Sequence, residues 1–317
     1  MNPAPTQHSD PAENRRGIVA MVVSMATFTL NDAFMKSVTQ SLPLMQSIAI
    51  RGGLTIIALV ILGRIIGGLT FRLPRRDRVM LAWRTVGEVG ATFTFLTALM
   101  HMPLANLAAI MQAMPLAVTL AAAVFLAEPV GWRRMSAIAV GFAGVLFIVK
   151  PGTGGFDVWS LVALSSVAFV VLRDLSTRQF SAGLPTVLVA LSAAVSVTAM
   201  GLLGMIINGG WVPVTGAELG KIAIASSALV LGYVCSVRAM RHGEVALIAP
   251  FRYTALLWAI LFGWIGFRTL PDYWTWVGAA LVVASGLFAL WRQATSRRKV
   301  PAMRGLPESA HHATLEN

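Results

Sequence analysis

Long apolar runs separated by short polar or basic links occupy most of the 317-residue chain. A bilayer core about 30 Å thick requires about 20 helical residues, which is close to the length of most of these runs. We therefore predict an all-α integral membrane protein. Its ten predicted transmembrane helices cover residues 17–36, 45–63, 79–99, 104–127, 135–150, 158–176, 186–207, 217–237, 244–266 and 273–291.

Composition supports the membrane assignment and excludes several classes of chemistry. Only 12% of the residues are charged, whereas a soluble domain has roughly 25%. A single cysteine gives no disulfide frame and no thiolate metal site, and no nucleotide-binding motif is present. We expect no enzyme activity, no cofactor and no metal. The expected partners are a small-molecule substrate and the lipid bilayer, without nucleic acid, and a homodimer is left open.

Basic residues concentrate in the tails and in alternate links between the runs. The richer side carries Arg15, Arg16, Arg64, Arg72, Arg75, Arg76, Arg78, Arg133, Arg134, Arg173, Arg178, Arg238, Arg241, Arg292, Arg297, Arg298, Lys299 and Arg304. The other side carries Lys36, Lys150, Lys221 and Arg268. Because Lys and Arg collect in cytoplasmic loops, both termini are predicted to be cytoplasmic. Residues 1–16 form the N-terminal tail, and residues 292–317 form a basic, disordered tail.

The segments that end the first and sixth runs align without a gap. When LNDAFMKSVTQSLP (30–43) is placed over LRDLSTRQFSAGLP (172–185), Leu, Asp, Leu and Pro coincide, and Lys36 aligns with Arg178. We call this alignment, residue 30 on residue 172, the repeat register. Chance agreement between Leu- and Ala-rich helices is the alternative interpretation. Otherwise the alignment predicts that the second half of the chain repeats the first.

A second pair of runs aligns in nearly the same register. LANLAAIMQAM (104–114) aligns with EVALIAPFRYT (244–254). Two halves of five helices have opposite topology because five is odd, and inverted repeats of this kind are common in secondary transporters. We therefore predict two inverted five-helix repeats, over residues 17–150 and 158–291.

One stretch resembles a known family. MPLANLAAIMQAMPLAVTLAAAVFLAEPVGWRRMSAIAVGFAGVLFIVKPG (102–152) is similar to the fourth and fifth helices of EamA-domain proteins of the drug/metabolite transporter superfamily. Pro115, Glu128 and the small residues over 141–144 match that pattern as they stand. The segment APFRYTALLWAILFGW (249–264) resembles part of a second such domain.

The resemblance implies a ten-helix carrier in a bacterial inner membrane that moves small metabolites without ATP hydrolysis. LRDLSTRQF (172–180) and APFRYT (249–254) are most similar to branches that include riboflavin and S-adenosylmethionine carriers. GFRTLP (266–271) departs from the pattern, because it lacks the Glu usual after the ninth helix. Riboflavin uptake is the leading expectation, with import or export of amino acids, S-adenosylmethionine or nucleotide-like metabolites as alternatives. A non-transporting structural or sensory subunit is the alternative from a different class.

Polar residues deep in the predicted helices are candidates for substrate binding, because an ionisable group inside a bilayer is costly. Arg252 lies well inside the ninth run, and Gln112 occupies the matching position in the fourth. Tyr253 and Trp258 add aromatic surface for stacking on a flat ring. Arg51 either binds an anion or bridges helices. Arg252 has a similar structural alternative, which is to tie helices together through backbone carbonyls.

Four further charged residues are candidates for coupling or gating. Glu88 lies in the third run with Arg84 four residues before it. Glu88 is therefore either a protonation site that couples transport to a proton gradient or the partner of Arg84. Asp32 and Asp174 occupy equivalent positions near the ends of the first and sixth runs. Each is either a gate residue or a helix-end carboxylate paired with the basic residue four positions on.

Overall fold

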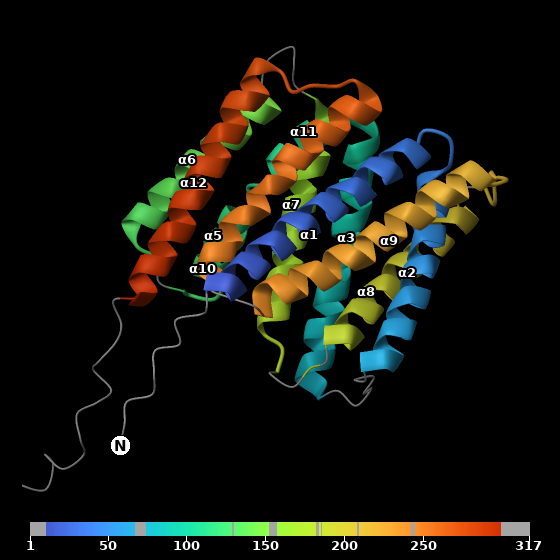
Figure 1. Cartoon of the computed structure of the whole chain (residues 1–317), viewed down its shortest axis with the longest axis horizontal. Coiled ribbons are helices and arrows are strands. Elements are labelled where there is room, and N and C mark those ends of the chain that lie inside the picture. Colours follow the sequence, from blue (N-terminus) through green and yellow to red (C-terminus); the bar gives the residue numbers. More distant parts are fainter. Residues whose placement is uncertain are drawn as a thin grey trace, which may run out of the picture.

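The structure, a computed structural model, describes residues 11–66, 74–128, 130–151, 157–181, 184, 186–207, 209–241 and 245–298. This part of the chain is helical and contains no strand. The elements are α1 (Pro11–Val38), α2 (Leu44–Ile66), α3 (Arg75–His101), α4 (Leu104–Met111), α5 (Met114–Phe125), α6 (Trp132–Val149), α7 (Val158–Arg178), α8 (Thr186–Ile207), α9 (Gly216–Arg241), α10 (Val245–Ile248), the 3₁₀ helix η1 (Ala249–Tyr253), α11 (Thr254–Phe267) and α12 (Tyr273–Arg298) (Figure 1).

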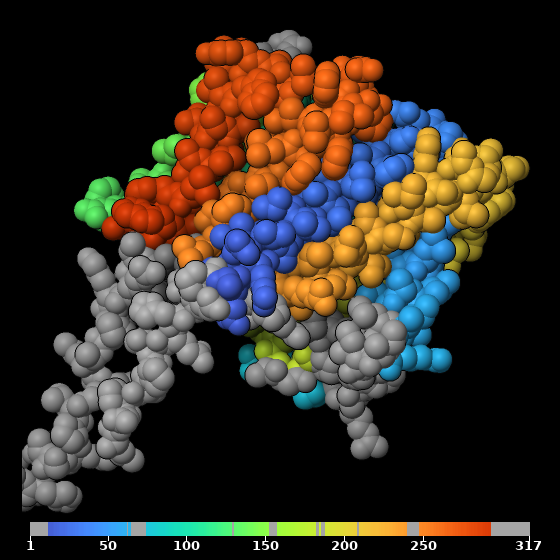
Figure 2. Space-filling view, viewed as in Figure 1, coloured from blue at the N-terminus to red at the C-terminus, as the bar shows by residue number. Residues whose placement is uncertain are grey.

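Each of the ten predicted runs corresponds to one helix or to one interrupted helix. Within the described residues, nine helical segments are long and apolar enough to cross a membrane, counting α4 with α5 as one and η1 with α11 as another. The tenth segment, α3, is not among them, because Arg, Asp and Glu residues lower its hydropathy. Helices α1, α9, α11 and α12 form much of the face in Figure 2. Large apolar side chains such as Leu231 of α9 and Trp264 and Ile265 of α11 are exposed. The chain is a multi-pass membrane protein.

Two helix boundaries differ from the prediction. α1 begins at Pro11 instead of residue 17, with Glu13 in its first turn, where a carboxylate interacts favourably with the helix dipole. α12 continues to Arg298 instead of residue 291, because no proline or glycine interrupts it there. The start of the predicted disordered tail is therefore helical. Residues 1–10 and 299–317 lie outside the described residues.

The helices pack mainly in four pairs, which are α1 with α9, α3 with α7, α2 with α8 and α6 with α12. In Figure 1, α1 lies beside α9, α2 beside α8 and α6 beside α12. Gly144 of α6 faces the backbone oxygen of Gly278 of α12 so closely that a Cβ would lie 2.7 Å from it. Small residues at such crossings let helix backbones approach within a membrane. The largest buried cluster includes Leu99, Leu107 and Ala259, which come from α3, α4 and α11.

Polar contacts join the links between helices at one end of the bundle. We call the end where α1 begins and α12 ends the proximal end, and the opposite end the distal end (Figure 1). At the distal end Gln46 exchanges two hydrogen bonds with the backbone of Val212, at 2.6 and 2.9 Å. Lys150 forms an ion pair with Asp272. Although partial burial acts in the opposite direction, hydrogen bonds from Lys150 and Thr275 hold the pKa of Asp272 below its ordinary value.

Candidate functional site

Two of the crossings are interrupted, and the interruptions position the candidate site. α4 ends at Met111, and α5 begins at Met114 with Pro115 in its first turn. In the other crossing, η1 carries Pro250. Proline lacks a backbone N–H and clashes with the preceding turn, so it favours a helix start over a helix interior. Gln112 and Arg252 thereby lie at the two interruptions and not within regular α-helix.

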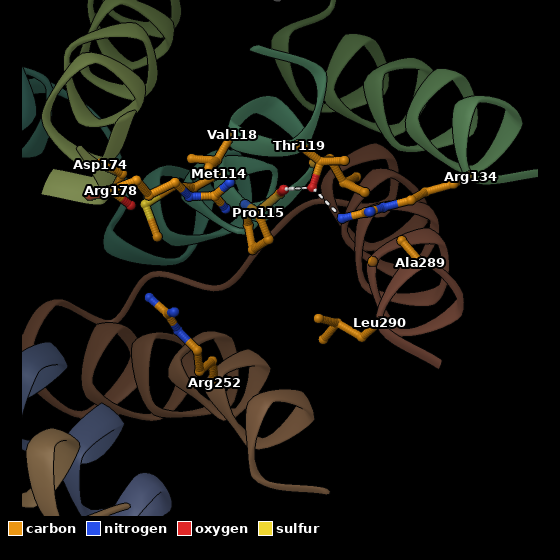
Figure 3. Close-up of a pocket in the computed structure, with 12 residues that line it drawn as sticks. Met114, Pro115, Val118, Thr119, Arg134, Asp174, Arg178, Arg252, Ala289 and Leu290 are labelled. Carbon is orange, nitrogen blue, oxygen red and sulfur yellow. Dashed lines mark hydrogen bonds between the residues drawn. The ribbon is translucent and has the colours of Figure 1, made fainter. Parts of the chain in front are cut away.

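A cavity of about 180 Å³ lies beside these interruptions (Figure 3). Its walls come from α5, α6, α7, η1 and α12, so both halves of the chain contribute. The polar lining residues are Thr119, Arg134, Asp174, Arg178 and Arg252. The rest of the lining is apolar side chain and glycine from α5 and α12. Because Arg134 lies in the first turn of α6 and Arg178 is the last residue of α7, the cavity is located toward the proximal end.

Arg252 points from η1 across the cavity toward Asp174 and Arg178 (Figure 3). Within the described residues it makes no hydrogen bond or ion pair, although Asp174 attracts it and Arg173 repels it at longer range. A guanidinium presents five N–H donors in a rigid fork and carries a permanent charge. Arg252 is therefore available to bind an acceptor that enters the cavity.

Two further arginines contribute positive charge to the same cavity. Arg178 forms an ion pair with Glu128 at 3.3 Å, and both side chains are nearly half exposed. Arg134 donates a hydrogen bond to the hydroxyl of Thr119 at 3.0 Å (Figure 3). Among the described lining residues, three arginines therefore face one carboxylate, Asp174. Such a surface favours a ligand that carries carboxylate or phosphate, because Arg binds both through charge-assisted, frequently bidentate hydrogen bonds.

An ionic cluster of Arg84, Glu88, Arg173 and Asp174 joins α3 to α7 and adjoins the cavity. Glu88 lies 3.4 Å from Arg84 and 3.8 Å from Arg173, while Arg173 donates a hydrogen bond to Asp174 at 2.9 Å. The Glu88 side chain is only 12% exposed. The predicted Arg84 contact is present, and Arg173 is an additional partner that the sequence did not indicate. Asp174 pairs with its neighbour Arg173 instead of the residue four positions on.

Arg51 and Asp32 lie in a second polar group inside the bundle. The Arg51 guanidinium donates a long hydrogen bond, 3.5 Å, to the side-chain oxygen of Asn31, and the side-chain NH₂ of Asn31 donates a hydrogen bond to the carboxylate of Asp32 at 2.9 Å. The Nε of Arg51 is buried without a hydrogen-bond partner among the described residues. Asp32 therefore contacts its neighbour Asn31, and Lys36 donates its hydrogen bonds to backbone carbonyls instead.

The other predicted substrate-binding residues do not line the cavity. Tyr253 is 6% exposed, and its hydroxyl packs against Gly286, which does line the cavity. Trp258 stacks on Phe262 with ring centroids 5.9 Å apart. Gln112 is 8% exposed at the interruption after α4. Of the predicted site residues, the structure thus brings Arg252 and Asp174 together in one cavity.

Sequence reasoning did not predict that Thr119, Arg134 and Arg178 line the cavity. Both arginines lie near helix ends next to links and were interpreted as topology signals, and Arg178 was in addition an alternative partner for Asp174. The alignment of Arg178 with Lys36 was the available signal that Arg178 has a further role.

Comparison with known proteins finds similarity to membrane transporters. Residues 15–150 match the EamA-like transporter family. The chain is 27% identical to a pseudopaline exporter of Pseudomonas aeruginosa, over 86% of this chain and 94% of that protein. It is 25% identical to a riboflavin transporter of Rhizobium johnstonii, over 72% and 79% of the two chains. An S-adenosylmethionine uptake transporter of Rickettsia felis is 24% identical, over 62% and 67%.

A solved crystal structure shares the fold. It superposes with a TM-score of 0.61 and covers 89% of this chain and 99% of its own, at 20% sequence identity. At that identity the similarity describes the fold alone.

Proposed function

Because residues 15–150 match the EamA-like transporter family, we propose that this protein is a secondary carrier of a small organic metabolite that works by alternating access. The family and the relatives are membrane transporters and not enzymes. This agrees with the expectation from the sequence, which carries no catalytic motif. We therefore propose transport as the general function and consider the identity of the substrate separately.

The observation that carries the proposal is the guanidinium of Arg252, which faces the cavity and is bound by none of the described residues. It lies at an interrupted helix, where backbone and side-chain groups are available to a substrate. Interrupted helices near the membrane centre are typical of carrier binding sites. With Arg134 and Arg178 in the same cavity, the favoured substrate is a metabolite with an acidic or strongly hydrogen-bond-accepting group.

We further propose that the two halves form an inverted repeat. Ser24 of α1 donates a hydrogen bond to the carbonyl of Gly232 in α9, and Ser166 of α7 donates one to the carbonyl of Ala91 in α3. Ser24 and Ser166 are aligned with each other in the repeat register. Under the same alignment α1 corresponds to α7 and α9 to α3, so the pair α1–α9 corresponds to the pair α7–α3. The interruption after α4 likewise corresponds to the one at η1.

For localisation we propose a bacterial inner membrane with the proximal end in the cytoplasm. Arg134 and Arg178 lie at that end, in agreement with the greater number of basic residues in the proximal links. The structure then represents a carrier whose cavity lies toward the cytoplasmic side.

Riboflavin uptake is the finer proposal for the substrate. Riboflavin transporters are among the relatives, and the Arg252 fork matches the imide edge of a flavin ring. The positions of Tyr253 and Trp258 outside the cavity lining leave ring stacking without a described partner there. Amino acids, S-adenosylmethionine and nucleotide-like metabolites are therefore tested beside riboflavin.

The test is transport by the purified protein in liposomes, with labelled riboflavin, S-adenosylmethionine, amino acids and nucleotides on one side. We expect saturable movement of at least one of these compounds. If a folded protein moves none of them in either direction, a structural or sensory role is favoured instead.

Arg252→Lys tests the site once a substrate is found. Lysine keeps the charge and loses the fork, and a hydrogen bond to a charged group contributes about 1.5–3 kcal/mol. We expect affinity to fall roughly tenfold to a hundredfold, measured by substrate-induced thermal stabilisation. Arg133→Lys is the matched control, because Arg133 lies outside the cavity lining, against Trp132. Equal affinity in both variants would make Arg252 a structural residue.

A further inference from the structure

Lys36 joins three helices at the distal end. Its ammonium donates hydrogen bonds to the carbonyls of Leu99 and Met102, at 2.5 and 2.9 Å, where α3 ends. It also lies 5.6 Å from the ring centroid of Phe267, where α11 ends. The carbonyl end of a helix carries partial negative charge, so a buried ammonium is favourable there. We call the bonds from Lys36 to these two carbonyls the distal gate contact.

The distal gate contact connects two helix pairs that have only a small packing interface with each other. α1 packs mainly along α9, and α3 packs mainly along α7. The contact of another lysine at this end stays within a pair, because Lys221 of α9 donates a hydrogen bond to the hydroxyl of Ser37 of α1 at 2.9 Å. Lys36, in contrast, links α1 to the end of α3.

Arg178 is the sequence counterpart of Lys36 and lies at the opposite end. Each is in the last turn of its helix, α1 for Lys36 and α7 for Arg178, and the two are aligned in the repeat register. Their environments differ. Lys36 is 9% exposed and bound to backbone carbonyls, whereas the Arg178 side chain is 46% exposed, pairs with Glu128 and lines the cavity.

We propose that Lys36 and Arg178 are alternating gate residues of the carrier. In the present conformation Lys36 closes the distal end by holding α1 to the carbonyl end of α3. When the cavity closes, Lys36 is released, and Arg178 leaves Glu128 to bind the carbonyl end of α9, which finishes at Arg241. This inference rests on the proposed carrier function, and it assigns a role in the transport cycle to two residues outside the predicted site.

The test measures the distal end directly and needs no substrate. Spin labels are attached to cysteines at Gln40, just after α1, and at Val158, the first residue of α7, both exposed. The native Cys235 is replaced by serine. Distances between the labels are recorded by pulsed electron paramagnetic resonance in lipid nanodiscs. We expect one short-distance population for the labelled parent protein.

Lys36→Met should raise the fraction of molecules with a longer label distance by roughly tenfold or more, because it removes two hydrogen bonds from a charged donor. Lys36→Arg should keep the short distance. Lys221→Met is the matched control and should also keep it, since its hydrogen bond stays within the α1–α9 pair. If Lys36→Met does not give a monodisperse protein, Lys36→Gln takes its place, with a smaller increase expected in the same direction.

The inference is overturned if the Lys36 variant keeps the parent distance distribution, or if Lys221→Met lengthens the distance equally. Failure of the carrier function has a different signature, which is absence of transport by the labelled parent protein. A longer distal distance in Lys36→Met combined with transport by the parent supports both proposals.

Discussion

Replacing Glu88 by glutamine tests whether the ionic cluster holds α3 against α7. The carboxylate faces Arg84 at 3.4 Å and Arg173 at 3.8 Å, and its side chain is 12% exposed. Removing one partner from a buried ion pair costs about 3–5 kcal/mol, because the remaining charge stays buried without compensation. Arg173 keeps its contact with Asp174 at 2.9 Å. We therefore expect the lower end of that range, about 3 kcal/mol.

Glu128→Gln is the matched control. The pair of Glu128 with Arg178 has nearly the same separation, 3.3 Å, but its side chains are 48% and 46% exposed. Exposed pairs contribute less than about 1 kcal/mol. The assay is thermal unfolding of the purified variants in one detergent. At about 2 °C per kcal/mol for a large chain, Glu88→Gln should lower the Tm by about 6 °C and Glu128→Gln by less than about 2 °C.

Equal, small shifts for the two variants would refute the reasoning, because they would mean that water screens the ionic cluster as well as the exposed pair. The double change of Arg84→Gln with Glu88→Gln then separates two roles in transport. If Glu88 serves to neutralise Arg84, the double variant should recover transport lost in either single variant. If Glu88 carries the coupling proton, transport driven by a pH gradient should stay lost.

Two further predictions concern topology and packing. A reporter that is active only in the cytoplasm should be active when fused after Arg134 or Arg298, and an inactive fusion at either site would contradict the proposed orientation. Gly144→Ala should lower stability by about 1–3 kcal/mol relative to Gly53→Ala, because the added Cβ meets backbone at 2.7 Å at Gly144 and nothing within 4 Å at Gly53. Thermal unfolding measures this difference, and equal Tm values would argue against a close α6–α12 crossing.

The positions of the crossings could be predicted because apolar length is a local property of the sequence. Pro250 is the sequence signal for the interruption at η1, because it removes a backbone donor within an apolar run. The interruption before Pro115 was not predicted, since residues 104–127 form one apolar run of suitable length. Proline in the first turn of a new helix and proline within a continuous helix have the same sequence signature.

The composition of the candidate site could be predicted only in part, because it depends on helix rotation and on which helices meet. Arg252 faces the cavity, whereas Tyr253, its neighbour, lies about 120° further around the axis of the 3₁₀ helix and packs against Gly286. The contact between Glu88 and Arg173 joins α3 to α7, and α4, α5 and α6 lie between them in the sequence. No local pattern encodes such a pairing, so only the three-dimensional arrangement revealed it.

The charge content of α3 has a consequence for how the protein is made. Ribosomes deliver α3 to the translocon before α7 exists, so immediate insertion would take Arg84 and Glu88 into the lipid phase without Arg173, their later neighbour. Arg and Asp at a helix centre each disfavour insertion by about 2.5–3.5 kcal/mol. We therefore expect α3 to remain uninserted, at the translocon or the membrane surface, until α7 has been synthesised. A chain truncated before α7 should leave α3 poorly inserted and open to degradation, while α1 and α2 span the membrane normally.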